Sequence, residues 1–424
     1  MIRPSPGKGA TAFVLTHESN PKRKHKSLSI IALALTRSLG RKGVRVVRVH
    51  PNALDHSLGS RYCAELAVSP DMYADPLALV EWLLKLADNY PGKRVLIPAS
   101  DDCAQFLGEH HAALSAAFEL CAADSDVMAL LVNKRHQYEH AVRLGIPIPE
   151  TYFPKDAAEI DQLAGQVRNF PYILKPLVAH TWRLASMRHV SKGRKAVLVR
   201  TPDEIREAYQ ALGEGVKDIM LQEVIGGRDE ELFTFLGYFT KDSRPLAYCV
   251  RRKIRQSPLD FGYCTMTISC HDDKVVEQSI TLLQGLRYSG IVGVEYKYDA
   301  ATGQYKLIEI NARAVNTIGL APACGVDVPY IAYQDLAGAA VEPAMTWRDG
   351  VAWYRIWPDF FAVRELRRRG KATYREWWKS LWGDHVEAVF AGDDLKPAWS
   401  YFGTLVLGEI SARGRKLVPW LKQP

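Results

Sequence analysis

Residues 293–313, GVEYKYDAATGQYKLIEINAR, contain the pattern that decides the fold. Apolar residues alternate with polar or small ones on both sides of Thr302-Gly303, which predicts two strands joined by a tight turn. In such a hairpin Glu295 and Glu309 lie side by side on one face, and Asn311 lies two residues further along that face. Two carboxylates and an amide oxygen are the hard ligands that Mg²⁺ takes when it also binds phosphates. An exposed hairpin with an ordinary polar face is the alternative that this spacing leaves open.

The run Glu-Ile-Asn-Ala-Arg at 309–313, following an acidic strand, resembles the metal-binding hairpin of the ATP-grasp superfamily. The resemblance implies that Glu295, Glu309 and Asn311 hold two magnesium ions, or manganese in their place, against ATP. It also implies that Arg313 lies beside the transferred phosphoryl group. Lysines of an ATP site are then expected upstream of the hairpin.

Length, composition and charge narrow the class of protein. A chain of 424 residues exceeds one hydrophobic core, so two or three domains are expected. A net charge of +8 favours anionic ligands without requiring nucleic acid, and we expect no nucleic-acid partner. The seven cysteines form no Cys-x-x-Cys pair, which suits a reducing compartment. With no apolar N-terminal segment and no apolar run approaching ~18 residues, the expected location is cytoplasmic.

The first part of the chain has a strand–helix–strand pattern. Strands at 12–16 and 44–50 flank a helix at 28–39, which predicts a parallel sheet. No G-x-G-x-x-G follows the first strand, and this argues against a dinucleotide site. The cationic loop at 20–26 is either a solvated charge run or an anion-facing loop at the end of a strand. A later strand ends in Ser100-Asp101-Asp102, which resembles the acceptor-facing strand end of ATP-grasp proteins.

Two lysines match the ATP lysines of the superfamily in order and spacing. Lys134 lies in an expected helix at 126–145, and Lys175 lies in the apolar strand at 172–176. Burying an unpaired ammonium is costly, so Lys175 needs an anion, either a phosphate or a structural carboxylate. The loop after this strand contains Arg183 and few glycines, so the resemblance implies a lid that binds phosphates through arginine side chains rather than through a glycine-rich backbone.

The segment at 219–231 resembles the hinge that contacts the nucleoside. The resemblance implies that the backbone of Glu223, Val224 and Ile225 pairs with adenine. An acidic residue a few positions on then holds the ribose. Glu230 and Glu231 are adjacent and point to opposite faces of an extended segment, so only one can do this, and we choose Glu230.

The strand that follows, near 248–256, is unusually basic. It is either an edge strand protected by charge or a face that overlooks the γ-phosphate of ATP. We prefer the second interpretation and expect Arg252 and Arg255 to bind the carboxylate that is activated.

The last part of the chain is rich in tryptophan and arginine. Trp377, Trp378, Leu381 and Trp382 alternate with basic residues in a pattern typical of amphipathic helices. A small helical cap is the plainer expectation, and contact with a membrane surface is the alternative.

The predicted fold class is α/β, with α+β character in the nucleotide-binding part. It comprises a leading parallel-sheet domain (1–125), a lid subdomain (126–200), an antiparallel ATP and metal subdomain (201–340) and a helical extension (341–424). Over about residues 10–340 the chain resembles the carboxylate–amine ligase group, near its D-aspartate-ligase-like branch. That resemblance implies a small-molecule carboxylate activated by ATP as an acyl phosphate and coupled to an amine, with a homodimer as one allowed assembly. A phosphotransferase and a non-catalytic nucleotide- or surface-binding protein are the alternatives.

Overall fold

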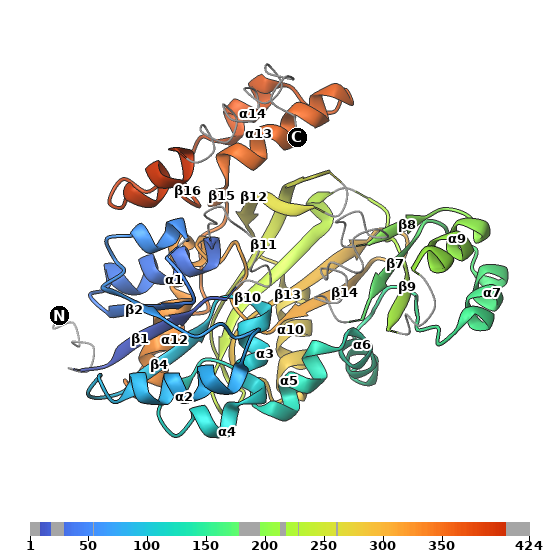
Figure 1. Ribbon diagram of the computed structural model, residues 1–424. Coiled ribbons are helices and arrows are strands. Elements are labelled where there is room, and N and C mark those ends of the chain that lie inside the picture. The colour runs from blue at the N-terminus through green and yellow to red at the C-terminus, as the bar shows by residue number, and fades with distance from the viewer. Residues whose placement is uncertain are drawn as a thin grey trace, which may run out of the picture.

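The computed structural model describes residues 9–17, 29–53, 55–177, 196–212, 218–227, 229–259 and 262–403. Within these ranges the strands form three sheets, of five, four and seven strands. Figure 1 shows the four-stranded sheet standing to one side of the other two.

The five-stranded sheet is parallel, in the order β3-β2-β1-β4-β5. Its strands are β1 (Thr11–Leu15), β2 (Arg45–His50), β3 (Glu65–Val68), β4 (Arg94–Pro98) and β5 (Glu119–Leu120). Its helical elements are α1 (Ile30–Arg41), η1 (His56–Gly59), α2 (Pro76–Ala87), α3 (Asp101–Glu109) and α4 (His111–Leu114). The strand order reverses between β1 and β4, and the carboxyl ends of strands at such a point are where α/β proteins place ligands.

Two helices connect this sheet to the next, where the sequence predicted one. These are α5 (Ser125–Val132) and α6 (Lys134–Arg143). Asn133 adopts an extended conformation between them, and its side chain accepts a hydrogen bond from the backbone N–H of Arg135. This is the geometry of an N-cap, so α6 begins afresh at Lys134.

The four-stranded sheet is antiparallel, in the order β6-β9-β7-β8, and has its own core. Its strands are β6 (Thr151–Tyr152), β7 (Tyr172–Pro176), β8 (Val197–Val199) and β9 (Ile219–Glu223), covered by α7 (Ala157–Gln166) and α9 (Pro202–Leu212). The sequence predicted that the lid subdomain ends at residue 200, which would leave β9 outside this sheet. In the structure the sheet includes β9 and therefore extends to Glu223. Pairing of β9 with β6 and β7 is non-local, and no local pattern indicates it.

The seven-stranded sheet has the order β14-β13-β10-β11-β12-β15-β16. Its strands are β10 (Leu232–Phe239), β11 (Pro245–Ser257), β12 (Tyr263–Ser269), β13 (Gly290–Asp299), β14 (Gln304–Asn311), β15 (Ala352–Tyr354) and β16 (His385–Glu387). The helical elements beside it are η4 (Asp229–Glu231), α10 (Asp273–Gly285), α11 (Leu320–Cys324) and α12 (Val328–Leu336).

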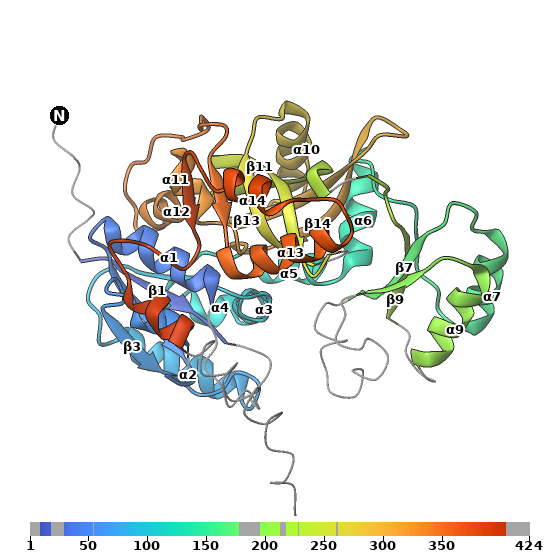
Figure 2. The same ribbon diagram turned by 90° about the horizontal axis from the view of Figure 1, so that it is seen from above.

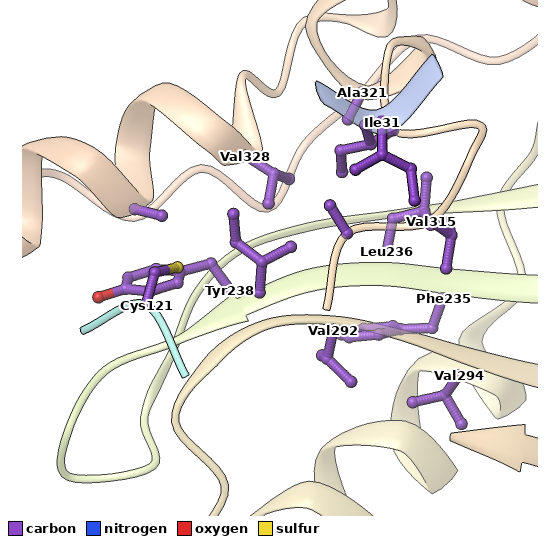
Figure 3. Packing of buried hydrophobic residues seen from close by; sticks show 14 of the residues in the cluster. Ile31, Cys121, Phe235, Leu236, Tyr238, Val292, Val294, Val315, Ala321 and Val328 are labelled. Atoms are coloured by element: carbon purple, nitrogen blue, oxygen red, sulfur yellow. The ribbon is translucent and has the colours of Figure 1, made fainter. Parts of the chain in front are cut away.

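One hydrophobic core joins the five- and seven-stranded sheets. Ile31 of α1 lies in the same buried cluster as Phe235 and Leu236 of β10 and Val292 of β13, as Figure 3 shows. Because burial of apolar side chains is the main stabilising contribution, these two sheets hold each other in place.

The C-terminal extension is mixed rather than purely helical. Helices α13 (Ile356–Arg368) and α14 (Tyr374–Ser380) are flanked by β15 and β16, and these strands continue the seven-stranded sheet. Figure 2 shows α13 and α14 lying over that sheet.

Candidate active site

The hairpin of β13 and β14 has the predicted geometry. Glu295 pairs directly with Glu309, and Gly293 pairs with Asn311. The turn is closed by Gly303, whose φ of 68° favours glycine and whose N–H donates to the carbonyl of Asp299 at 2.8 Å. Both glutamates keep part of their side chains accessible, 23% for Glu295 and 35% for Glu309.

The hairpin offers oxygen ligands only. The candidate ligands that its register brings together are the two carboxylates and the Asn311 amide. Among the described residues no three His, Cys, Asp or Glu side chains form a group that could hold a metal ion. A set with so few protein oxygens suits Mg²⁺, which retains positions for water and phosphate. The donor chemistry therefore fits the ion that the superfamily resemblance implies.

Lys134 lies at this hairpin because α6 packs on β14. The hydroxyl of Tyr138 donates to the carbonyl of Ile308 at 2.6 Å, and Gln137 accepts from the N–H of Ile310 at 3.1 Å. The Lys134 ammonium donates to the Glu309 carboxylate. Burial alone would lower the pKa of Lys134, but the Glu309 charge raises it above its usual value.

Lys175 in β7 lies close to the same group. The backbone N–H of Lys134 donates to the carbonyl of Leu177, two residues beyond Lys175, at 3.2 Å. Burial and then the Lys134 cation lower the pKa of Lys175 to about 7, opposed in part by Glu309 and Glu295. Within the described ranges its ammonium has no hydrogen bond or ion pair, so a bound anion would relieve an unfavourable burial.

The predicted hinge forms the end of β9. The Glu223 carboxylate accepts from the N–H of Glu150 at 3.0 Å and from the Lys306 ammonium at 3.2 Å. The N–H of Val224 donates to the carbonyl of Pro171 at 3.0 Å, and Ile225 follows, half-buried. Lys306 was not predicted, although the signal was present: like Lys175, it is a lysine within an apolar strand.

The two candidate ribose ligands lie on the short turn η4. The Glu231 carboxylate is 3.6 Å from the Lys297 ammonium on β13, and Glu230 is half-buried beside it. The choice of Glu230 stays a prediction.

Strand register places Arg251, not Arg252, on the face of the candidate metal ligands. Thr234 of β10 pairs with both Arg251 and Glu295, and the Arg251 guanidinium is 3.9 Å from the Glu295 carboxylate. Arg252 instead shares a row with Phe233 and Tyr296, whose hydroxyl contacts Ser279 of α10 on the other face. The expectation that Arg252 contributes to the site is therefore corrected, since adjacent residues of a strand point to opposite faces.

Arg255 is already occupied by a structural contact. Its Nε and Nη2 donate to the carboxylate of Asp359 in α13, at 2.7 Å in the shortest contact, and Nη2 also reaches Ser380 at 2.9 Å. Asp359 is fully buried. The predicted role of Arg255 in binding substrate is thus corrected as well: it attaches the C-terminal helices to β11.

Arg313 connects the hairpin to the five-stranded sheet. It donates to both carboxylate oxygens of Asp101, at 2.7 and 2.9 Å, and approaches Asn311 Oδ1 at 3.4 Å. Asp101 follows β4, at the point where the strand order reverses. A small cavity of about 80 Å³ lies here, lined among others by Asp101, Lys134, Glu309 and Asn311.

Two predicted features lie outside the described residues. These are Arg183, with the lid loop that contains it, and the cationic loop at 20–26. Five of the remaining predicted residues lie together at the hairpin: Lys134, Glu295, Glu309, Asn311 and Arg313. Lys175 is near enough to interact with Lys134, and Glu223 is linked to the hairpin through Lys306.

The fold is the ATP-grasp fold, as the resemblance predicted. A family model described as "ATP-grasp in the biosynthetic pathway with Ter operon" matches residues 239–355. Residues 239–355 thus resemble an ATP-grasp family domain, and solved structures share the fold of the chain.

Individual relatives include ligases. D-aspartate ligase from Enterococcus faecium is 26% identical over 276 residues, which cover 62% of this chain and 64% of that protein, somewhat less than two thirds of its length. The biotin carboxylase domain of Hydrogenobacter thermophilus 2-oxoglutarate carboxylase, solved with MgADP, matches with a TM-score of 0.60 and 15% identity, covering 81% of this chain and 73% of that one. L-amino acid ligase from Bacillus licheniformis matches with a TM-score of 0.56 and 13% identity, covering 79% and 76%.

Proposed function

We propose that this protein is an ATP-dependent ligase that joins a small carboxylate to an amine. The observation that carries the proposal is the convergence of Glu295, Glu309, Asn311, Lys134 and Lys175 at one point between the sheets. Hard oxygen ligands and two buried cations in one place match the needs of a metal–triphosphate complex. The names of two relatives, a D-aspartate ligase and an L-amino acid ligase, support the reaction class.

The nucleotide would lie between the four- and seven-stranded sheets. Lys134 and Lys175 would bind its phosphates, and Glu230 would bind its ribose. The carbonyl of Glu223 and the amide of Ile225 would form hydrogen bonds with the edge of its adenine. Glu295, Glu309 and Asn311 would hold Mg²⁺, which when bound neutralises phosphate charge. Arg183 would bind phosphate from the lid loop.

The reaction would proceed in two steps. A carboxylate oxygen of the acid attacks the γ-phosphorus of ATP, the bond to ADP breaks, and an acyl phosphate forms. The amine nitrogen then attacks the acyl carbon, inorganic phosphate leaves, and the amide loses a proton. Arg313 and Arg251 supply positive charge where the carboxylate and the transferred group lie.

A carboxylate suits this site better than a hydroxyl. A hydroxyl nucleophile needs a general base to accept its proton, whereas a carboxylate arrives ionised and needs only positive charge to orient it. The face that carries Glu295 supplies Arg251 at 3.9 Å, and the hairpin end supplies Arg313.

The proposal is tested by screening pooled acids and amines for release of ADP and phosphate, with mass spectrometry of the product. We expect an amide whose formation matches ADP release one to one. A phosphorylated compound without an amide would identify a phosphotransferase. Nucleotide binding without turnover on any pool would favour the non-catalytic alternative.

A further inference from the structure

Helices α13 and α14 expose a row of large aromatic side chains. On α14 and just beyond its C-terminal end, Tyr374, Trp378 and Trp382 recur every four residues and are 38%, 58% and 70% exposed. On α13, Trp357 and Phe361 have the same spacing and are 41% and 47% exposed. We call these five residues the aromatic surface. Trp357 packs on Phe402 and Tyr374 stacks on Phe360, yet all five side chains keep a large exposed area, as in an apolar stripe at helical spacing.

The inner side of the two helices is firmly attached to the protein. Trp377 Nε1 donates to Asp359 at 2.8 Å, and Asp359 also binds Arg255. Leu381 is buried in a small cluster with Met266 and Tyr354. The aromatic surface is therefore the outward face of an anchored helix pair, and not an unpacked interior.

The segment that carries the aromatic surface is basic. Residues 355–382 contain eight arginines and lysines against three acidic residues, a difference of +5. One of the acidic residues, Asp359, is fully buried against Arg255. The cations are Arg355, Arg364, Arg367, Arg368, Arg369, Lys371, Arg375 and Lys379.

We propose that the aromatic surface docks on a bilayer that contains anionic phospholipid. Indole rings favour the headgroup level of a bilayer, and arginine and lysine at its edge favour lipid phosphate. A second copy of this chain fits less well, because it would bring like charges together. None of the helices in the described ranges combines the length and hydropathy needed to span a membrane, so the contact is peripheral.

Docking would attach the central sheet to the membrane through the extension. Helix α13 is attached to β11 through Asp359 and Arg255, and the same strand carries Arg251, which pairs with Thr234 in the row that also contains Glu295. The inference rests on the extension alone and is independent of the proposed reaction.

The first test is co-sedimentation of the full chain with vesicles. Wild type should bind phosphatidylcholine vesicles containing about a quarter phosphatidylglycerol, and bind pure phosphatidylcholine much more weakly. Trp378→Ser with Trp382→Ser should lower the partition coefficient on the order of tenfold or more. The matched control, Val68→Ser with Leu77→Ser, changes residues 56% and 63% exposed outside the extension and should bind as wild type does.

The second test addresses charge. Lys371→Ala with Lys379→Ala should weaken binding about 25-fold, since each cation near an anionic surface contributes about fivefold. Lys85→Ala with Lys155→Ala, exposed lysines outside the extension, should change it little. Raising NaCl from about 0.1 to about 0.5 M should also weaken binding.

Three results would overturn the proposal: no binding to anionic vesicles, equal binding to neutral ones, or tryptophan and lysine variants that bind like wild type while their circular dichroism is unchanged. Retention of an oligonucleotide in place of vesicles would assign the surface to nucleic acid instead.

Discussion

At the scale of single residues, the candidate site is arranged for a highly charged ligand. Lys134 and Lys175 lie close enough for the first to depress the pKa of the second, and Glu309 is the carboxylate that Lys134 binds. Two buried cations beside each other are unfavourable unless anions accompany them. Binding of a metal at Glu309 would require the Lys134 contact to loosen, and the freed ammonium would then be available to phosphate.

Replacing Glu309 by glutamine tests the proposed metal site. Loss of one charged oxygen ligand should remove several kcal/mol of transition-state stabilisation and abolish ADP formation. The melting temperature should fall, because the Lys134 ammonium is left beside Lys175 without the carboxylate it binds, and circular dichroism at the assay temperature checks that the variant is folded. Glu277→Gln on α10, whose side chain is 66% exposed and pairs with Lys274, is the control. Near-normal turnover of the Glu309 variant would remove this residue from the site.

Replacing Lys175 by methionine tests the proposed phosphate site. The change removes a buried cation with no partner among the described residues, so folding should not suffer, whereas ATP binding should weaken at least tenfold. Isothermal titration with a non-hydrolysable ATP analogue measures this. Lys274→Met, an exposed lysine on α10, should bind as wild type does. Equal affinities in the two variants would contradict the assignment.

At the scale of elements, the sequence predicted the features that depend on a local pattern. It did not predict those that depend on pairing between segments far apart in the chain. The hairpin that brings Glu295 and Glu309 together is local, and its strand alternation and Thr302-Gly303 turn were sufficient to predict it. The choice between Arg251 and Arg252 depends on which residue of β11 lies opposite Thr234, and that register joins strands far apart in sequence. Only the structure could decide it.

Other differences have the same origin. The pairing of β15 with β12 and of β9 with β7 is non-local, so the extension was expected to be helical and the lid to end at residue 200. The break at Asn133 is different, because an N-cap residue can be recognised from sequence. The apolar periodicity continues on both sides of Asn133, so the sequence pattern predicted one helix instead of two.

Variants of the two adjacent arginines separate the faces of β11. Arg251→Met should lower kcat/KM for ADP release about 100-fold, since it removes a positive charge beside the proposed reacting groups. Arg252→Met, on the opposite face, should lower it much less. The comparison needs any substrate pair found by the screen, and a larger effect at Arg252 would contradict the register-based assignment.

The contact of Asp359 with Arg255 joins α13 and α14 to the central sheet. Asp359→Asn leaves the Arg255 cation buried without its charge partner and should lower the free energy of unfolding by about 3 kcal/mol. Urea unfolding measures the loss. Glu365→Gln on the same helix, whose side chain is 41% exposed, should cost little. A loss of similar size in both variants would mean that the buried pair has no special role.

At the scale of the whole molecule, the extension returns to the five-stranded sheet. Asp394 is buried against Arg37 of α1 at 2.9 Å and also accepts from Ser60 at 2.7 Å. Next to it, Asp393 accepts from Arg41 and Tyr62 at the surface. These contacts connect residues more than 330 positions apart, so the first and last described parts of the chain stabilise each other.

The surface part of this contact should respond to acid. The hydrogen bond from Arg41, outweighing the opposing effect of burial and assisted by Tyr62, holds the pKa of Asp393 well below its usual value. A carboxyl group with a depressed folded pKa contributes stability that is fully present above its unfolded pKa, about 3.9, and is lost as pH falls through the folded pKa.

Asp393→Asn should therefore lower the free energy of unfolding at pH 7 by at most about 1 kcal/mol, because the pair is more than one-third exposed and screened by water. The difference from wild type should shrink steadily below about pH 4. Urea titrations of both proteins across this range measure it, and Asp393→Asn placed in an Arg41→Gln background should have a smaller effect at pH 7 than it has alone. A wild-type advantage that grows as the pH falls would reverse the sign of the argument and exclude this contact as its source.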